Sequence, residues 1–238
     1  MNKTLATVVV CLALLMAIPA MADVTVGLPP DPGSGNCFPW GCAYNAHYQQ
    51  VYDQGAFSGP ITITNLEFYN TQFNSFSTFL GGTGNWAITL STTFANVNTL
   101  SGSFAGNLAN GPGDSVAVWS GNISQAWSFP QTLTINLMHP FTYNPAVGRN
   151  LLMTVVGSNV SLAGGAVYFD VNSTGGMMSR VYCSGGIDCG DNGTVTPGYG
   201  LVTTFSTGNS LTPEPGTLVM LGTGVLGLAS ILRRKMNL

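Results

Sequence analysis

Apolar and polar side chains alternate along the middle of the chain, and this alternation restricts it to β structure. Apolar residues take every second position in 86–91 and 132–137, which is the period of a strand with one buried face. No stretch between residues 47 and 206 keeps the period of 3.6 residues that a helix requires. About ten short strands between glycine-rich turns predict an all-β fold, an antiparallel two-sheet β-sandwich that is jelly-roll-like.

Several strands can be assigned from the pattern. Residues 151–156 are almost continuously apolar, which predicts a central strand covered on both sides. In 60–69 the apolar residues change parity, which predicts a bulge near Asn65, because a side-chain period of two shifts only with an extra residue. Gly81-Gly82 is expected to separate two strands. Further strands are expected at 48–53, 101–106, 115–120, 166–171, 179–184 and 200–206.

The N-terminus has the layout of a secretory signal peptide. Lys3 supplies the positive charge, and Leu5 to Ile18 form an uncharged apolar stretch. Ala20-Met21-Ala22 has small residues at both positions that signal peptidase reads. We therefore expect signal peptidase to cleave after Ala22.

A second uncharged apolar segment, Thr217 to Leu232, lies near the C-terminus. A helix of this length spans roughly 24 Å, and the flanking arginines lengthen it by reaching the membrane interface. Arg233, Arg234 and Lys235 follow it and are expected to stay in the cytoplasm under the positive-inside rule. The segment is thus predicted to be a single transmembrane helix with the folded body on the outer side.

Pro213-Glu214-Pro215 stands just before this apolar segment. The tripeptide, the apolar segment and the basic cluster together resemble the PEP-CTERM sorting signal of exported bacterial proteins. The resemblance implies that exosortase, an integral-membrane enzyme, recognises the chain and processes it at the motif. It also implies that the chain is anchored in the membrane before processing and then reaches the cell surface or a polysaccharide matrix.

The body carries a second resemblance, in 48–52 and in 140–145, to a recurring extracellular β-sandwich of PEP-CTERM proteins. This likeness implies a fold and no activity. The expected organisation is a signal peptide at 1–22, a Gly/Pro-rich lead-in with a cysteine pair at 23–46, the β-sandwich at 47–207, a linker at 208–212, and the sorting signal at 213–238 with its transmembrane helix at 217–232 and basic tail at 233–235.

The charge of the body excludes nucleic acid as a partner. Only 6% of the chain is charged. Between residues 23 and 212 there are two basic residues, Arg149 and Arg180, and eight acidic ones, a net charge of −6. Binding of nucleic acid requires a basic patch that neutralises phosphates, and two arginines cannot build one.

Four cysteines remain after the expected cleavage, and an exported chain meets an oxidising compartment. An even number of cysteines in that setting predicts disulfides, and three pairings are possible. The short spacings favour Cys37–Cys42 and Cys183–Cys189. The alternative is a metal site of four thiolates, for which zinc sites prefer tighter pairs.

The body offers candidate binding residues but no catalytic arrangement. Glu67 is its one glutamate, whereas a glycosidase needs a pair of carboxyl groups, and no nucleophile-elbow motif is present. Asp188 and Asp191 are candidates for calcium, with an ordinary Asp/Asn/Gly turn as the alternative. Trp119 is a candidate for stacking on sugar rings, because it falls on the parity opposite to its valine neighbours. The alternative for Trp119 is core packing.

The expected function follows from the tail more than from the body. We expect an exported cell-surface or extracellular-matrix protein, associated with exopolysaccharide, whose non-enzymatic sandwich has a structural or adhesive role and no cofactor. Signal peptidase and exosortase are its expected processing partners. The alternative is a lectin-like carbohydrate-binding module, with or without calcium.

Overall fold

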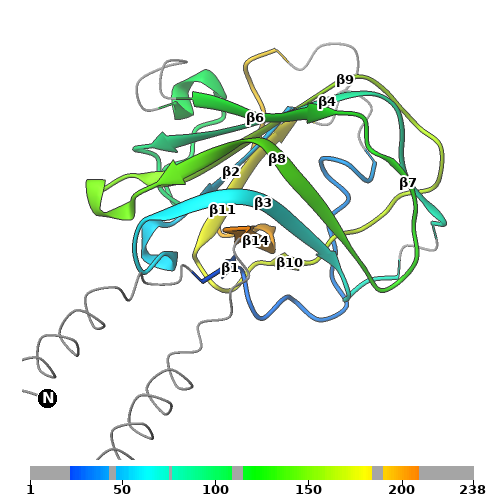
Figure 1. Ribbon diagram of the computed structural model, residues 1–238, viewed down its shortest axis with the longest axis horizontal. Helices are drawn as coiled ribbons and strands as arrows, with labels where there is room; N and C mark the ends of the chain where they lie inside the picture. Colours follow the sequence, from blue (N-terminus) through cyan, green and yellow to red (C-terminus); the bar gives the residue numbers. More distant parts are fainter. Residues whose placement is uncertain (1–21, 43–46, 75–76, 109–114, 184–189, 209–238) are drawn as a thin grey trace, which may run out of the picture. The chain divides into compact units, whose positions relative to one another are not determined.

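The fold was analysed in a computed structural model of the chain, which describes residues 22–42, 47–74, 77–108, 115–183 and 190–208. Asp23–Gly208 form one compact unit. Two large antiparallel sheets build this unit, and the predicted two-sheet β-sandwich is confirmed (Figure 1). Within the described residues the only helical turns are short 3-10 helices, in agreement with the absence of a helical period in the sequence.

The larger sheet has the strand order β12-β11-β2-β9-β4-β6, with β7 paired to β4. Its strands are β2 (His47–Tyr52), β4 (Phe79–Thr93), β6 (Ser115–Gly121), β7 (Ser124–Ala126), β9 (Asn150–Leu162), β11 (Met178–Cys183) and β12 (Thr194–Thr196). The smaller sheet has the order β1-β14-β3-β8. Its strands are β1 (Val24–Val26), β3 (Ile61–Asn70), β8 (Gln131–Tyr143) and β14 (Thr203–Ser206). A two-stranded pair joins β10 (Val171–Asn172) to β13 (Gly200–Leu201).

Each face of the larger sheet buries apolar side chains, because alternate residues of a strand point to opposite faces. The inner face and the smaller sheet share a main core, to which β4 contributes Ile88 and Leu90 and β3 contributes Leu66 and Phe68. The outer face carries a second, smaller cluster, which we call the outer cluster. It consists of Val51, Leu100, Phe104, Leu152 and Val181.

The outer cluster exists because residues 94–108 fold back over the larger sheet. Leu100 and Phe104 of this segment pack on strand residues of β2, β9 and β11. The segment contains a 3-10 helix, η2 (Ala105–Asn107), and no strand, so the strand predicted at 101–106 is wrong. The segment is a loop that packs two apolar side chains, Leu100 and Phe104, on the sheet face.

The structure confirms one of the finer expectations in full and a second in part. The pairing of β3 with β8 shifts register between Ile63 and Asn65, where the bulge was predicted. β9 lies in the middle of the larger sheet, between β2 and β4, and its residues Leu151 to Met153 are all fully buried. Val156 is 41% exposed, so the run 151–156 is covered on both faces only in its first half.

Two other expectations are wrong. β4 runs through Gly81-Gly82 instead of breaking there. Gly81 has a φ of +78°, and a Cβ atom on it would lie 1.9 Å from the carbonyl oxygen of Ile123, so this glycine permits a close approach of two backbones. The strand predicted at 166–171 is reduced to an isolated bridge at Phe169 and the two residues of β10.

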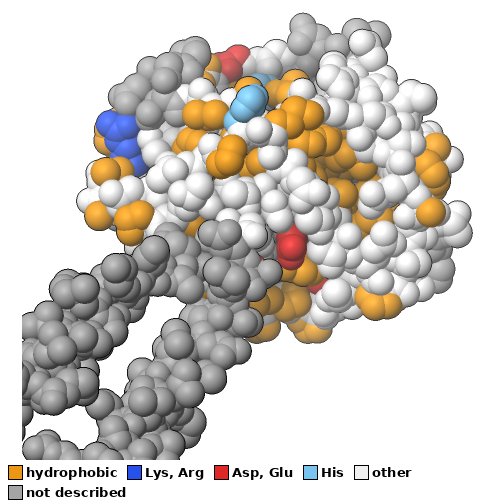
Figure 2. Space-filling model, viewed as in Figure 1, with side chains coloured by type: hydrophobic (Ala, Val, Ile, Leu, Met, Phe, Trp, Pro, Cys, Tyr) orange, Lys and Arg blue, Asp and Glu red, His pale blue; other side chains and the backbone are white. Residues whose placement is uncertain are grey.

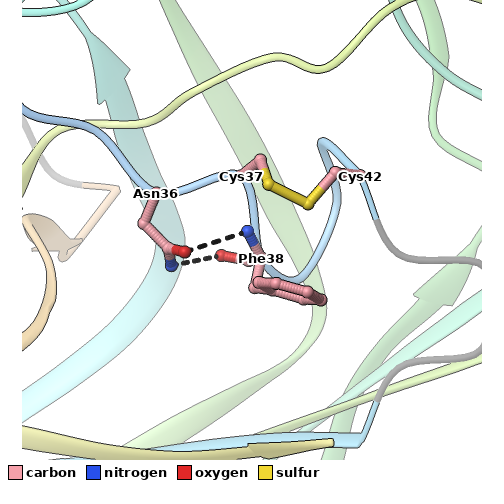
Figure 3. Close-up of a disulfide and its surroundings, with 4 residues drawn as sticks. All are labelled: Asn36, Cys37, Phe38 and Cys42. Atoms are coloured by element: carbon pink, nitrogen blue, oxygen red, sulfur yellow. Dashed lines mark hydrogen bonds between the residues drawn. A yellow bond between two sulfur atoms is a disulfide. The ribbon is translucent and has the colours of Figure 1, made fainter. Parts of the chain in front are cut away.

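A disulfide between Cys37 and Cys42 closes a small loop in the lead-in, which is the pairing that their spacing favoured (Figure 3). The side-chain amide of Asn36 donates to the carbonyl of Phe38 at 2.9 Å, and its oxygen accepts from the Phe38 N–H at 3.3 Å. Inside the loop, Trp40 is fully buried and its ring lies 4.3 Å from that of Phe68. The loop therefore delivers a large aromatic side chain to the main core.

The two predicted terminal elements lie outside the described residues, namely all but the last residue of the signal peptide and the whole transmembrane helix at 217–232. Among the helices that the structure does describe, none has the length and apolarity to cross a membrane.

Candidate functional site

A hollow of about 300 Å³, open to solvent, lies on the outer face of the larger sheet. It lies beside residues 94–108, at the place where this segment no longer covers the outer face of the sheet. On the side of the molecule shown in Figure 2, uncharged side chains cover most of the described surface, as the low charge content leads one to expect. The hollow is lined by His47, Gln49, Thr89, Phe104, Ala105, Leu108, Ser115, Thr154 and Asp191.

The floor of the hollow is a row of polar side chains that crosses three strands. Gln49 of β2 pairs with Thr154 of β9, and Thr154 pairs with Thr89 of β4. Paired residues of antiparallel strands project to the same face, so the three side chains stand next to one another. The adjacent row, which includes Val51 and Leu152, belongs to the outer cluster and is covered.

Buried hydrogen bonds fix the wall of the hollow to its floor. The amide of Gln49 donates to the carbonyl of Phe104 at 3.1 Å and to the Thr154 hydroxyl at 3.1 Å. Its oxygen accepts from the side chain of Asn107 at 3.0 Å, and Asn107 also accepts from the Ser101 N–H at 2.8 Å. Gln49 and Asn107 are each 1% exposed, so these bonds are shielded from water.

His47 and Asp191 form one end of the hollow. The imidazole is stacked on the ring of Phe104, with centroids 3.6 Å apart and planes inclined by 12°. Burial lowers the pKa of His47 below its ordinary value, although a hydrogen bond to the Gly190 backbone and the charge of Asp191 act in the opposite direction. The neutral imidazole is thus the favoured form at neutral pH.

Asp191 accepts hydrogen bonds from the other side of the wall. Its carboxylate accepts from the Ser103 hydroxyl at 2.5 Å and from the Ala105 N–H at 2.7 Å. These two hydrogen bonds hold the pKa of Asp191 below its ordinary value, so the group is ionised at neutral pH. A carboxylate has about four acceptor positions, and those left over face solvent because the residue is exposed.

Ser115 borders the hollow at the edge strand β6. Its hydroxyl oxygen is buried and has no hydrogen-bond partner in the described part of the chain. Its cross-strand neighbour Ser91, which is fully buried, is in the same condition. Within the described ranges, these two buried hydroxyls therefore leave donor and acceptor capacity unused.

Neither arginine of the body lies in the hollow. The guanidinium of Arg149 lies over the ring of Phe94, 4.6 Å from its centroid. That of Arg180 is sandwiched between Tyr182 and Tyr199, at 4.6 and 4.3 Å, and is 9% exposed. Among the residues that the structure describes, the lining consequently has one carboxylate and no arginine or lysine.

Trp119, the sugar-stacking candidate, is partly buried and packs against the main core. It pairs with Ile88 of β4, so it lies on the inner face of the sheet, away from the hollow. The register of β6 against β4 shifts between Ile88 and Thr89, and this irregularity explains why Trp119 and Val118 depart from simple alternation.

The remaining predicted site residues are divided between the described and undescribed parts. Of the two calcium candidates, Asp191 accepts hydrogen bonds from Ser103 and Ala105, and Asp188 lies outside the described residues. No group of three or more His, Cys, Asp or Glu side chains that could hold a metal ion occurs in the part that is described. Cys183 is also in a disulfide, and its expected partner Cys189 lies outside the described residues.

The residues that line the hollow were not identified from the sequence, apart from Asp191. They come from six separate segments, and most are residue types that are common on exposed strands and loops. The pair Gln49-Gln50 between Tyr48 and Tyr52 was a usable signal, because two adjacent glutamines inside an apolar strand must bury one amide on each face.

The C-terminal tail was compared with known proteins. A family model for the PEP-CTERM protein-sorting motif matches residues 211–235, which include Pro213-Glu214-Pro215, the apolar segment and Arg233, Arg234 and Lys235. The chain carries a PEP-CTERM sorting motif. No curated protein and no solved structure matches the chain.

The PEP-CTERM motif supports an exported protein that is anchored in the membrane before exosortase processes it. The tripeptide and the basic cluster both lie outside the described residues, so the assignment depends on their sequence and order. The disulfide in the lead-in is compatible with export, because disulfides persist in oxidising compartments.

Proposed function

We propose that this protein is a non-catalytic β-sandwich that acts at the cell surface or in the extracellular matrix once its tail has been processed. The observation that carries the proposal is the PEP-CTERM motif at residues 211–235. In the proposed sequence of events, signal peptidase removes residues 1–22, the tail holds the body at the outer side of the membrane, and exosortase then releases it.

The carboxylates of the body support a structural role over a catalytic one. Asp170 is 2% exposed, and its oxygens accept from the Thr71 N–H, the Thr71 hydroxyl and the Gln72 N–H at 2.5 to 2.9 Å. It therefore fixes the turn after β3, and it is not among the residues in contact with Arg180. Glu67 accepts from the Tyr69 hydroxyl at 3.0 Å on a partly exposed strand.

Replacing Pro213, Glu214 and Pro215 by alanine tests the sorting step. The variant should accumulate as a larger species in the membrane fraction, because exosortase no longer recognises it. The matched control replaces Asn209 and Ser210, just outside the motif, and should be processed normally. Gel mobility and fractionation of membrane, surface and medium provide the readout, and normal processing of the triple variant would contradict the proposal.

Carbohydrate binding is the second candidate function, and the hollow on the outer face is the observation that favours it. Trp119 does not carry this candidate, because it packs on the core side of the sheet. Calcium is not part of the proposal, since Asp191 already accepts two hydrogen bonds from the protein.

A further inference from the structure

We propose that the hollow between residues 94–108 and the outer face of the larger sheet binds one neutral sugar residue of a glycan. This inference rests on the proposed placement of the body among surface or matrix polysaccharides. It names the ligand class and the binding residues, which the sorting motif does not.

The shape of the site suits a small ring compound. A volume of about 300 Å³ lies at the lower end of the range for ligand pockets. Strand side chains of the larger sheet form the floor of the hollow, and the segment 94–108 forms a wall that contains Phe104, Ala105 and Leu108. A sugar ring lying against such a wall can set its C–H groups on apolar carbon while its hydroxyls face the floor.

The polar groups match hydroxyls better than charged ligands. Thr89 and Thr154 supply hydroxyls that both donate and accept. Asp191 is ionised and retains acceptor positions for sugar hydroxyls.

The charge of the site excludes acidic ligands. No arginine or lysine is among the described residues that line the hollow, and a sugar acid would meet the carboxylate of Asp191 in a body whose net charge is −6. Like charges at close range raise the free energy of the complex. Neutral saccharides are therefore favoured over uronic acids, sulfated sugars and phosphates.

The site is also formed before any ligand arrives. Gln49 and Asn107 bind the wall to the floor through buried hydrogen bonds, and Asp191 ties Ser103 and Ala105. Binding to a rigid site does not require further ordering of the protein, so a small contact area can still give measurable affinity.

The test compares two substitutions of alanine by tryptophan, one that fills the hollow and one that lies elsewhere on the protein. Ala105 is exposed at the start of 3-10 helix η2, and its N–H is bound by a side-chain oxygen of Asp191. Ala146 is exposed within 3-10 helix η3 (Pro145–Val147), and its N–H is bound in the same way by Asn144. Ala105→Trp places an indole in the hollow, whereas Ala146→Trp places the same side chain outside it.

Binding is measured by titration calorimetry on the full chain in a polyoxyethylene detergent, since detergents with sugar head groups would compete. The probes are neutral oligosaccharides of glucose, galactose, mannose and N-acetylglucosamine, with oligogalacturonate as the acidic comparison. At least one neutral probe should bind with a Kd below about 10 mM, and oligogalacturonate should bind at least about tenfold more weakly.

The variants give the decisive comparison. Ala105→Trp should weaken binding of the neutral probe at least about tenfold, Thr89→Val should weaken it several-fold, and Ala146→Trp and Trp119→Phe should stay within about twofold. The inference is overturned if no neutral probe binds, if oligogalacturonate binds equally well, or if Ala105→Trp leaves binding intact. The processing assay on Pro213-Glu214-Pro215 is independent of all these outcomes, so failure of the sugar site is distinguishable from failure of the sorting proposal.

Discussion

Gln50 joins the larger sheet to β13 through a buried side-chain amide, and replacing it tests how much this link contributes. Its oxygen accepts from the Tyr48 hydroxyl at 2.5 Å and from the Leu201 N–H at 2.8 Å, and its nitrogen donates to the Leu201 carbonyl at 2.8 Å. All three residues are 0% exposed. Water cannot replace these hydrogen bonds without entering the core.

Gln50→Leu keeps the approximate size of the side chain and removes these three bonds, together with a contact from the amide nitrogen to the sulfur of Met178 at 3.2 Å. The Leu201 carbonyl still accepts from the Thr203 hydroxyl at 3.0 Å, so the Tyr48 hydroxyl and the Leu201 N–H are the groups that lose their partner. Each costs about 1–3 kcal/mol, and the added apolar carbon recovers part of this. We expect the free energy of unfolding to fall by about 2–4 kcal/mol, a large share of the roughly 5–15 kcal/mol typical of a domain.

Urea unfolding, followed by the fluorescence of the buried tryptophans, measures the effect. With a slope of roughly 2 kcal/mol per molar urea, the midpoint should fall by about 1–2 M while the slope stays constant. Gln125→Leu, on the exposed strand β7, is the control and should change stability by less than about 0.5 kcal/mol. A Gln50→Leu midpoint within a few tenths molar of the parent would refute the reasoning.

Three further perturbations probe other contacts. Burial lowers the pKa of His47 in the folded protein, so the unfolded chain binds the proton at a higher pH than the folded one. The free energy of unfolding should therefore decline as the pH falls from about 7.5 to about 5. The decline should be less steep in His47→Gln. Asp170→Ala leaves the donors of the turn after β3 without an acceptor and should cost about 2–4 kcal/mol in the same urea assay; an unchanged midpoint would show that water replaces the carboxylate. The double variant Cys37→Ser, Cys42→Ser opens a loop with a sequence separation of 5 and should lose about 2 kcal/mol. Reducing agent should lower the stability of the parent at least as far, because it also opens the disulfide of Cys183.

The fold class was predictable because the alternation of side chains is a local property of each strand. The parity change before Asn65 corresponds to a register shift, and the apolar run of β9 correctly places that strand inside the sheet, although Val156 at its end is exposed. The errors arose where a distant segment decides the local conformation. Gly81 lies within a strand, where the backbone at Ile123 approaches it closely. Residues 101–106 form no strand, and Phe104 of this segment packs on the outer face of the larger sheet instead.

The candidate site was largely invisible for the same reason. Gln49, Thr89 and Thr154 meet only through the register of β2, β9 and β4, which no short segment reveals. Trp119 was selected by its parity, and the irregular pairing of β6 reverses what that parity implies. The sorting tail was the opposite case, since its three parts are consecutive and depend on no partner in the fold.

The place of β14 in the smaller sheet determines when the domain can be completed during export. β14 is the last strand of the body, yet it lies between β1, the first strand, and β3. When a chain crosses a membrane with its N-terminus first, β1 and β3 emerge before β14. The two strands cannot both pair with β14 until Ser206, its last residue, has emerged. Closure of this sheet and arrival of the sorting motif, which begins a few residues later, therefore coincide in time. In the proposed sequence of events, exosortase therefore meets the motif only after β14 is available to complete the smaller sheet.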